Sequence, residues 1–265
     1  MTTATLRRFT ITILLIASQF ACASSSAEPK EQAHELAPKR ILFVGNSYFY
    51  YNDSLHNHVK RMAEENGPFS KGEYQYKSAT IGGARLSHHN LDSLLELGRL
   101  GIDEPFDLVI LQGGSSEPLT AESRRVFTEK AIELNEKIRA TGADVAMYMT
   151  HAYVKPHKKY DPKMIELIEP AYVDAAKAIE AFVIPVGLAF ERAYAQRPDL
   201  DLHKTFDGSH PSLLGTYLAA CVVYATVYER PAVNITYDYF GAVTKEDAMF
   251  LRKVADETVN AFRGK

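Results

Sequence analysis

The sequence predicts an α/β protein, a three-layer α/β/α sandwich built on a five-stranded, mainly parallel sheet. Two observations predict this class. Short segments that are apolar at nearly every position recur along the chain, and longer amphipathic segments with apolar side chains three or four positions apart lie between them. Strands that are apolar on both faces are typical of a parallel sheet whose two faces are covered by helices.

The first 23 residues carry the features of a secretory signal peptide. Two arginines precede the apolar run Ile11–Ala17, which is too short to span a bilayer, and Ala21 and Ala23 fit a small-x-small cleavage site. A buried helix is the alternative, but the Ser-rich stretch from Ser24 onward does not continue one. We therefore expect residues 1–23 to be removed on export, leaving a periplasmic or secreted protein.

Cys22 leaves a second outcome open for the N-terminus. A lipid on this cysteine would anchor the mature protein to a membrane, although Gln19 stands where we expect leucine in a lipoprotein signal. Residues 24–39 form a polar leader, and residues 40–265 contain no repeat, low-complexity tract or linker that divides them. We expect a single domain over 40–265 and no transmembrane segment in it.

Composition excludes several classes of function. The chain has 265 residues, 46% of them apolar, and a net charge of -3 that removal of the two N-terminal arginines would change to -5. An acidic protein without a clustered Lys/Arg stripe is a poor candidate for binding nucleic acid. Cys221 lies in an apolar run and is expected to be buried rather than disulfide-bonded, and no His/Cys/Asp cluster has the spacing of a metal site.

Strands and helices are expected to alternate along the rest of the chain. The five strands are 41–44, which ends in Gly45, then 74–81, 107–111, 143–149 and 182–186. A polar amphipathic helix follows the first strand. The next three helices are marked by apolar residues at helical spacing: Leu91, Leu94 and Leu95 before Gly98; Phe127, Ala131, Leu134 and Ile138; Ile165, Ile168, Tyr172, Ala175 and Ile179. Two more helical stretches, 212–228 and 245–262, close the chain.

Residues directly after the strands are informative because ligands bind outside the carboxyl ends of parallel strands. Gly45-Asn46-Ser47 follows the first strand, which would expose the Ser47 hydroxyl and place its N–H at the positive end of a helix. On position alone, a helix N-cap is the simpler explanation of Ser47. The segments Ile81-Gly82-Gly83-Ala84 and Gln112-Gly113-Gly114-Ser115-Ser116 follow the second and third strands, and each alone would be a turn or loop.

A fourth polar segment, Asp207-Gly208-Ser209-His210-Pro211, lies just before a helix near the C-terminus. An Asp three residues before a His can accept the ring N–H and so hold the tautomer whose other nitrogen takes a serine proton. A helix cap next to a surface histidine would give the same pattern. The pairing of Asp207 with His210 gains meaning only beside the other three segments.

The four segments, in this order, resemble the sequence blocks of the SGNH (GDSL-like) hydrolase superfamily, which has a flavodoxin-like fold. The string ILFVGNSYFYYN from Ile41 to Asn52, with Gly82-Gly83 and the stretch 111–118, resembles one bacterial subgroup of it, and the likeness covers residues 40–263. The resemblance implies Ser47 as nucleophile, His210 as general base and acid, and Asp207 as its orienting carboxylate. It implies no metal and no organic cofactor.

The resemblance also implies an oxyanion hole that contains the N–H groups of Ser47 and Gly83. The third block departs from the superfamily's Gly-x-Asn-Asp, whose asparagine completes the hole, because Gln112-Gly113-Gly114-Ser115 has no asparagine. This block resembles instead the Q-G-E-S string of some carbohydrate acetylesterases. We therefore expect Gln112 to supply the third donor.

Other polar and aromatic residues near these blocks have two explanations each. His88 and His89 would face substrate or begin a solvated helix, and His151 would line the pocket or form a structural hydrogen bond. The aromatic string Tyr48, Phe49, Tyr50 and Tyr51 would bind an acyl chain or a sugar ring, or pack in the core.

These features predict an exported serine esterase that hydrolyses carboxylic esters of a small molecule or glycan, with O-deacetylation of a glycan as the favoured reaction. A lipase, thioesterase or acyltransferase would use the same triad. A non-catalytic glycan-binding envelope protein on the same fold is the alternative from another class, prompted by the altered third block.

Overall fold

The computed structural model describes residues 1–2 and 37–264. The expected signal peptide, Cys22 and most of the polar leader lie outside these residues. Within the described part of the chain, no helix is long and apolar enough to cross a membrane.

A five-stranded sheet forms the centre of the fold, and all of its strands are parallel. The strands are β1 (Arg40–Gly45), β2 (Gln75–Thr80), β3 (Leu108–Leu111), β4 (Asp144–Tyr148) and β5 (Phe182–Ile184), in the spatial order β2-β1-β3-β4-β5. Gly45 pairs with Thr80, and Val44 with Leu111, so the first three strands end at one edge of the sheet. The predicted α/β/α class is confirmed, with a wholly parallel sheet.

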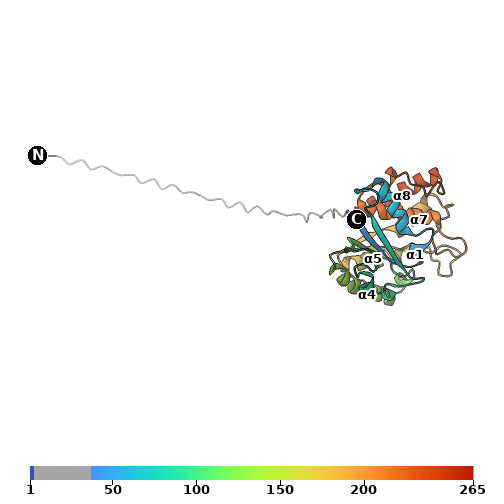
Figure 1. The fold of residues 1–265 in the computed structure, drawn as a ribbon, viewed down its shortest axis with the longest axis horizontal. Coiled ribbons are helices and arrows are strands. Elements are labelled where there is room, and N and C mark those ends of the chain that lie inside the picture. The colour runs from blue at the N-terminus through green and yellow to red at the C-terminus, as the bar shows by residue number, and fades with distance from the viewer. Residues whose placement is uncertain (3–36, 265) are drawn as a thin grey trace. The chain divides into compact units, whose positions relative to one another are not determined.

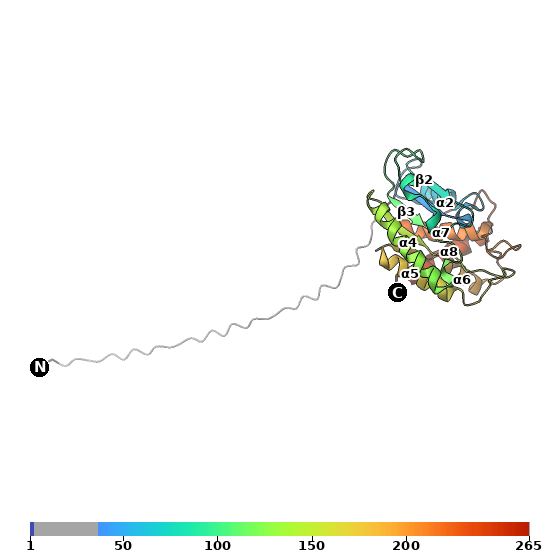
Figure 2. The same ribbon diagram turned by 90° about the horizontal axis from the view of Figure 1, so that it is seen from below.

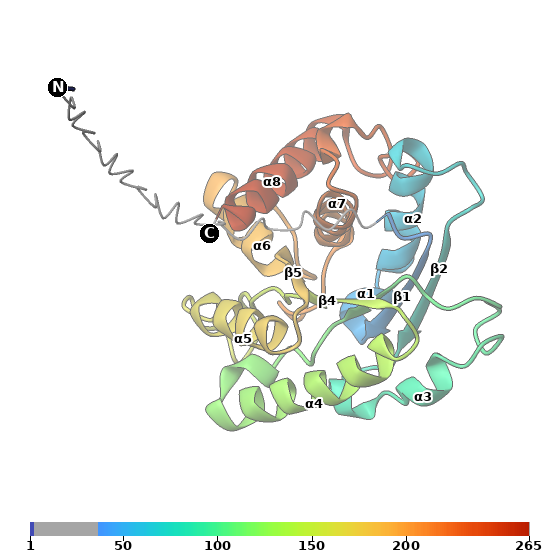
Figure 3. The same ribbon diagram turned by 90° about the vertical axis from the view of Figure 1, so that its left-hand side faces the viewer.

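Helices cover both faces of this sheet (Figures 1, 2 and 3). One face is covered by α3 (Leu91–Leu94), α4 (Ala121–Arg139) and α5 (Ile165–Ala178), and the other by α2 (Leu55–Asn66), α6 (Val186–Gln196), α7 (Leu213–Tyr228) and α8 (Lys245–Arg263). The remaining short elements are α1 (Ser47–Tyr50) and the 3-10 turns Leu86–His88, Glu117–Leu119 and Ala232–Asn234.

Alternation along the strands creates two separate apolar cores. Ile41 and Phe43 of β1 belong to the core under α7, whereas Leu42 and Val44 belong to the core under α4 and α5. Successive side chains of a strand point to opposite faces, so a strand buried on both sides must be apolar throughout. Cys221 on α7 is a free, fully buried thiol, as expected.

The helix α6 was not predicted, and the fifth strand ends earlier than expected. Ile184 is the last residue of β5, and Pro185, which has no N–H to donate, separates it from α6. The signal was present in the sequence, because Val186, Ala189, Phe190 and Ala193 follow helical spacing and are buried.

Candidate active site

Ser47 lies at the start of α1, immediately after β1. The N-cap of this helix is Asn46, whose side-chain oxygen accepts the Tyr48 N–H at 3.1 Å. The capping explanation of Ser47 is therefore wrong, since its neighbour performs that role. The Ser47 side chain is only 7% exposed, and no acceptor within residues 37–264 takes its N–H.

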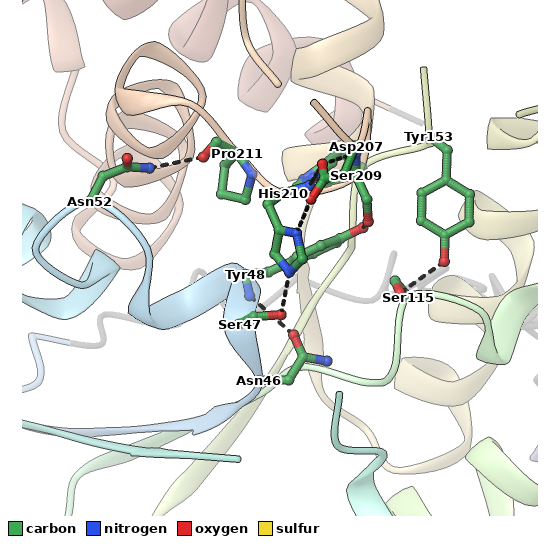
Figure 4. A network of polar contacts seen from close by, with 11 residues as sticks. Asn46, Ser47, Tyr48, Asn52, Ser115, Tyr153, Asp207, Ser209, His210 and Pro211 are labelled. Carbon is green, nitrogen blue, oxygen red and sulfur yellow. Dashed lines mark hydrogen bonds and ion pairs between the residues drawn. The ribbon is translucent and has the colours of Figure 1, made fainter. Parts of the chain in front are cut away.

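Ser47, His210 and Asp207 form a continuous hydrogen-bonded chain (Figure 4). Nε2 of His210 lies 2.9 Å from Oγ of Ser47, and Nδ1 lies 2.5 Å from Oδ2 of Asp207. The carboxylate accepts the ring N–H, so the unprotonated nitrogen faces the serine hydroxyl. This arrangement allows His210 to take a proton from Ser47.

The Asp207 carboxylate is fixed from its other side by backbone groups. Its Oδ1 accepts the N–H groups of Ser209 and His210 at 2.8 and 3.0 Å. Burial alone would raise the pKa of Asp207, but the hydrogen bonds from the His210 ring and these two N–H groups outweigh it and lower the pKa. Asp207 therefore stays ionised beside the imidazole.

Two contacts hold the loop that carries Asp207 and His210. Gly208 has φ +63°, and a Cβ there would lie 2.2 Å from the Val154 carbonyl oxygen, so only glycine fits. The side-chain amide of Asn52 donates to the carbonyls of Pro211 and Ser212, each at 2.9 Å, and to the Thr216 hydroxyl at 2.8 Å. Asn52 thus ties the segment after the nucleophile to the segment after the histidine.

A buried aromatic layer supports the triad from behind. The Tyr48 ring stacks on His151 with centroids 4.2 Å apart, and its hydroxyl lies 2.9 Å from Oγ of Ser209. His151 is fully buried and its Nε2 lies 2.9 Å from the Ser209 carbonyl oxygen, to which it donates. Burial lowers the pKa of His151 well below 6.5. His151 is therefore a neutral structural residue behind the pocket rather than part of its lining.

A pocket of about 390 Å³ opens over Ser47 and His210. Its described lining consists of four serines, three glycines, three tyrosines, an asparagine, an arginine and a histidine, with no aliphatic side chain. Gly83 lies in this wall with φ +69°, in the turn closed by the Ala84 N–H on the Ile81 carbonyl. No acceptor within the described residues takes the Gly83 N–H, so it can point at a ligand.

Gln112 does not fit the role of third oxyanion donor. Its side chain is fully buried and is not part of the pocket lining. Its oxygen accepts the Asn46 N–H at 3.0 Å, and its nitrogen donates to the Gly113 carbonyl. Gln112 supports the turn that carries the nucleophile, and its buried amide does not reach the pocket in which an oxyanion would form.

Ser115, in the same block, does line the pocket. The Tyr153 hydroxyl donates to Oγ of Ser115 at 2.8 Å, which leaves the Ser115 proton to be donated elsewhere (Figure 4). The sequence placed Ser115 in the third block but gave no reason to prefer it to Gln112. Tyr153 and Asn52 were missed entirely, because their partners lie 38 and about 160 residues away along the chain.

The histidines after the second block and the aromatic residues after Ser47 had two explanations each, and the structure distinguishes them. His88 is exposed and His89 is buried, and neither lines the pocket. Phe49 packs in the core, whereas Tyr50 and Tyr51 form part of the pocket wall.

Comparisons with known proteins find relatives through the fold. No protein-family model and no curated protein matches the sequence. A solved protein from Slackia heliotrinireducens, assigned as an SGNH hydrolase, is 25% identical with a TM-score of 0.58, covering 71% of this chain and 97% of that one. A DUF4886 family protein from Bacteroides uniformis is 18% identical with a TM-score of 0.63, covering 85% and 96%. An acetyl xylan esterase is 17% identical with a TM-score of 0.52, covering 71% and 99%.

Proposed function

We propose that this chain, a member of the SGNH (GDSL-like) hydrolase superfamily, is an exported serine esterase that removes small acyl groups from a glycan. Structural neighbours include an acetyl xylan esterase and a lipase/acylhydrolase, which supports an ester-acting hydrolase. The export part of the proposal rests on the signal-peptide pattern of residues 1–23.

The observation that carries the proposal is a hydrogen-bonded Ser47–His210–Asp207 chain at a pocket whose described lining has no aliphatic side chain. A binding protein has no need of a serine whose hydroxyl is aligned on a histidine. Fatty acyl chains are bound by apolar surface, because burying each CH₂ contributes about 0.8 kcal/mol. Serines, glycines and tyrosines favour a short acyl group on a hydroxyl-rich alcohol over a lipid.

The reaction proceeds by two acyl transfers. Ser47 Oγ attacks the ester carbonyl carbon while His210 Nε2 takes its proton, and the C–O bond to the alcohol then breaks as His210 returns that proton to the leaving oxygen. Water, deprotonated by His210, next attacks the acyl-serine, and Ser47 leaves with the proton. Asp207 stabilises the imidazolium in both steps and keeps its own charge.

The oxyanion is stabilised by the N–H groups of Ser47 and Gly83 together with the Ser115 hydroxyl. The two N–H groups have no acceptor within residues 37–264, and Tyr153 orients Ser115 by donating to its oxygen. Donors that are fixed before the reaction stabilise developing charge without reorganising during it. Ser115 thus takes the role that the sequence predicts for Gln112.

The test is hydrolysis of 4-nitrophenyl esters from acetate to dodecanoate by wild type, Ser47→Ala and Ser70→Ala, all purified identically. Ser70 is exposed and outside the pocket, so its variant is the matched control. We expect turnover that falls as the acyl chain lengthens, retention in Ser70→Ala, and loss in Ser47→Ala. Equal rates in Ser47→Ala and wild type would refute the triad, and a preference for long chains would favour a lipase.

The proposed substrate class is tested by acetate release from acetylated polysaccharides with the same three proteins. Transfer of acetyl to an added sugar faster than to water would identify an acyltransferase instead. Saccharide binding without turnover of any ester would favour the non-catalytic alternative.

A further inference from the structure

We infer that the pocket is built for an anionic sugar, and that Arg85 binds the carboxylate of an acylated uronic acid. The inference rests on the proposed esterase function and adds the chemical class of its substrate. Among the described residues that line the pocket, Arg85 is the one permanently charged side chain. No role in the acyl transfer requires a cation at this position.

Arg85 lies at the edge of the pocket beside the third block. It follows the Gly82-Gly83 turn and is exposed, and a Cβ on Gly114 would lie 3.2 Å from its Cγ. The side chain therefore runs alongside Gly114 at the pocket wall. No ion pair within residues 37–264 engages its guanidinium.

Glu117 is an acidic neighbour of Arg85, but its carboxylate is hydrogen-bonded to the Gly114 N–H. It is 2% exposed, and its Oε2 accepts the Gly114 N–H at 2.5 Å. Burial raises the pKa of Glu117, and the hydrogen bond from Gly114 and the charge of Arg85 oppose this effect. Glu117 does not line the pocket, so the donors of Arg85 remain available to a ligand there.

The pocket also has an aromatic wall, formed by Tyr50 and Tyr51, which suits the apolar face of a sugar ring. Tyr51 stacks on His210 with centroids 4.4 Å apart and on Tyr50 at 5.6 Å, and Tyr50 is 42% exposed. Aromatic faces offer flat apolar area to the C–H groups of a sugar. Nζ of Lys204 lies 5.9 Å from the Tyr51 ring, which places a second cation beside this wall.

Two cationic side chains lie at the site of a chain whose net charge is negative. The chain carries -3, yet Arg85 lines the pocket and Nζ of Lys204 lies beside the Tyr51 ring of its wall. The Asp207 carboxylate is already occupied by three N–H donors. Cations gathered at a pocket attract anionic substrates and exclude cationic ones.

The experiment compares two substrates that differ at one carbon, a mono-O-acetylated methyl glucuronide and the methyl glucoside acetylated at the same position. Acetate release is measured for wild type, Arg85→Gln and the charge-matched control Arg99→Gln, whose arginine is exposed and outside the pocket. We expect kcat/KM to favour the glucuronide by roughly tenfold in wild type and Arg99→Gln. Arg85→Gln should show no preference between the two substrates. Added salt should weaken the wild-type preference.

A binding measurement separates this inference from the esterase proposal. The two compounds are titrated by NMR into Ser47→Ala and into Ser47→Ala with Arg85→Gln, where no turnover is needed. Tighter binding of the glucuronide that disappears with Arg85 supports the inference even if wild type releases no acetate, a result that would reject only the esterase. Equal preference with and without Arg85, in either assay, would overturn the inference.

Discussion

Acid should destabilise the protein because His203 is buried in its neutral form next to the catalytic loop. Its Nε2 donates to the Ala152 carbonyl at 3.0 Å, and the Tyr194 hydroxyl donates to its Nδ1 at 2.7 Å. His203 also forms an isolated bridge with Pro211, which follows His210. Burial lowers the pKa of His203 from 6.5 to about 4.

The sign of the effect follows from which state binds the proton. Above pH 6.5 the ring is neutral in both the folded and the unfolded chain, and its contribution does not change. Between pH 6.5 and about 4 the unfolded chain binds a proton that the folded protein does not, so stability falls as pH falls. At 1.36 kcal/mol per pKa unit the full loss is about 3 kcal/mol, of which about 2 kcal/mol appears by pH 5.

Urea denaturation at pH 7.5 and 5 checks this value in wild type and His203→Gln. Glutamine keeps one donor and one acceptor but does not titrate, so the variant should lose about 2 kcal/mol less than wild type between the two pH values. His151 is buried in both proteins and leaves a shared pH dependence. His88→Gln, at an exposed position, should behave as wild type. The same loss in wild type and His203→Gln would show that His203 is not the acid-sensitive group.

Three substitutions test the site. Ser115→Ala should lower kcat about a hundredfold with KM unchanged in steady-state ester hydrolysis, and a change in KM alone would assign Ser115 to substrate binding. Asp207→Asn should lower kcat by about four orders of magnitude, because an amide favours the wrong imidazole tautomer; a loss under tenfold would argue against the triad. Asn52→Gly preserves the backbone at φ +54° but removes the amide, so we expect about 1–3 kcal/mol less stability by urea denaturation, together with a lower kcat. An unchanged kcat would limit Asn52 to folding.

The sequence was sufficient for β1, β3 and β4 because each of these strands is identified by its own residues. Leu42, Phe43 and their neighbours are apolar on both faces, which requires burial between two helical layers whatever the rest of the chain does. The same is true of Asp207 and His210, whose separation of three residues is a local property. Ser47 was recognisable by its position directly after a strand and by the other blocks that accompany it.

The sequence was insufficient where a side chain's direction decides its role. Gln112 and Ser115 lie three residues apart in one polar block. Gln112 is buried and accepts the Asn46 N–H, whereas Ser115 lines the pocket. That difference depends on how the turn after β3 packs against the turn after β1, which no local pattern encodes. Tyr153 acts on Ser115 from a segment after β4, so its function exists only in the folded chain.

The segment that follows β4 reaches both halves of the site. Tyr153 donates to Ser115 on the oxyanion side, while Val154 donates its N–H to the Gly208 carbonyl and His151 contacts the Ser209 carbonyl on the side of the base. This segment therefore helps to set the distance between the Asp207–His210 loop and Ser115, which we propose as an oxyanion donor. Insertions here should be poorly tolerated. Efforts to evolve a new substrate preference should leave this segment unchanged and vary Tyr50, which lines the pocket and is 42% exposed.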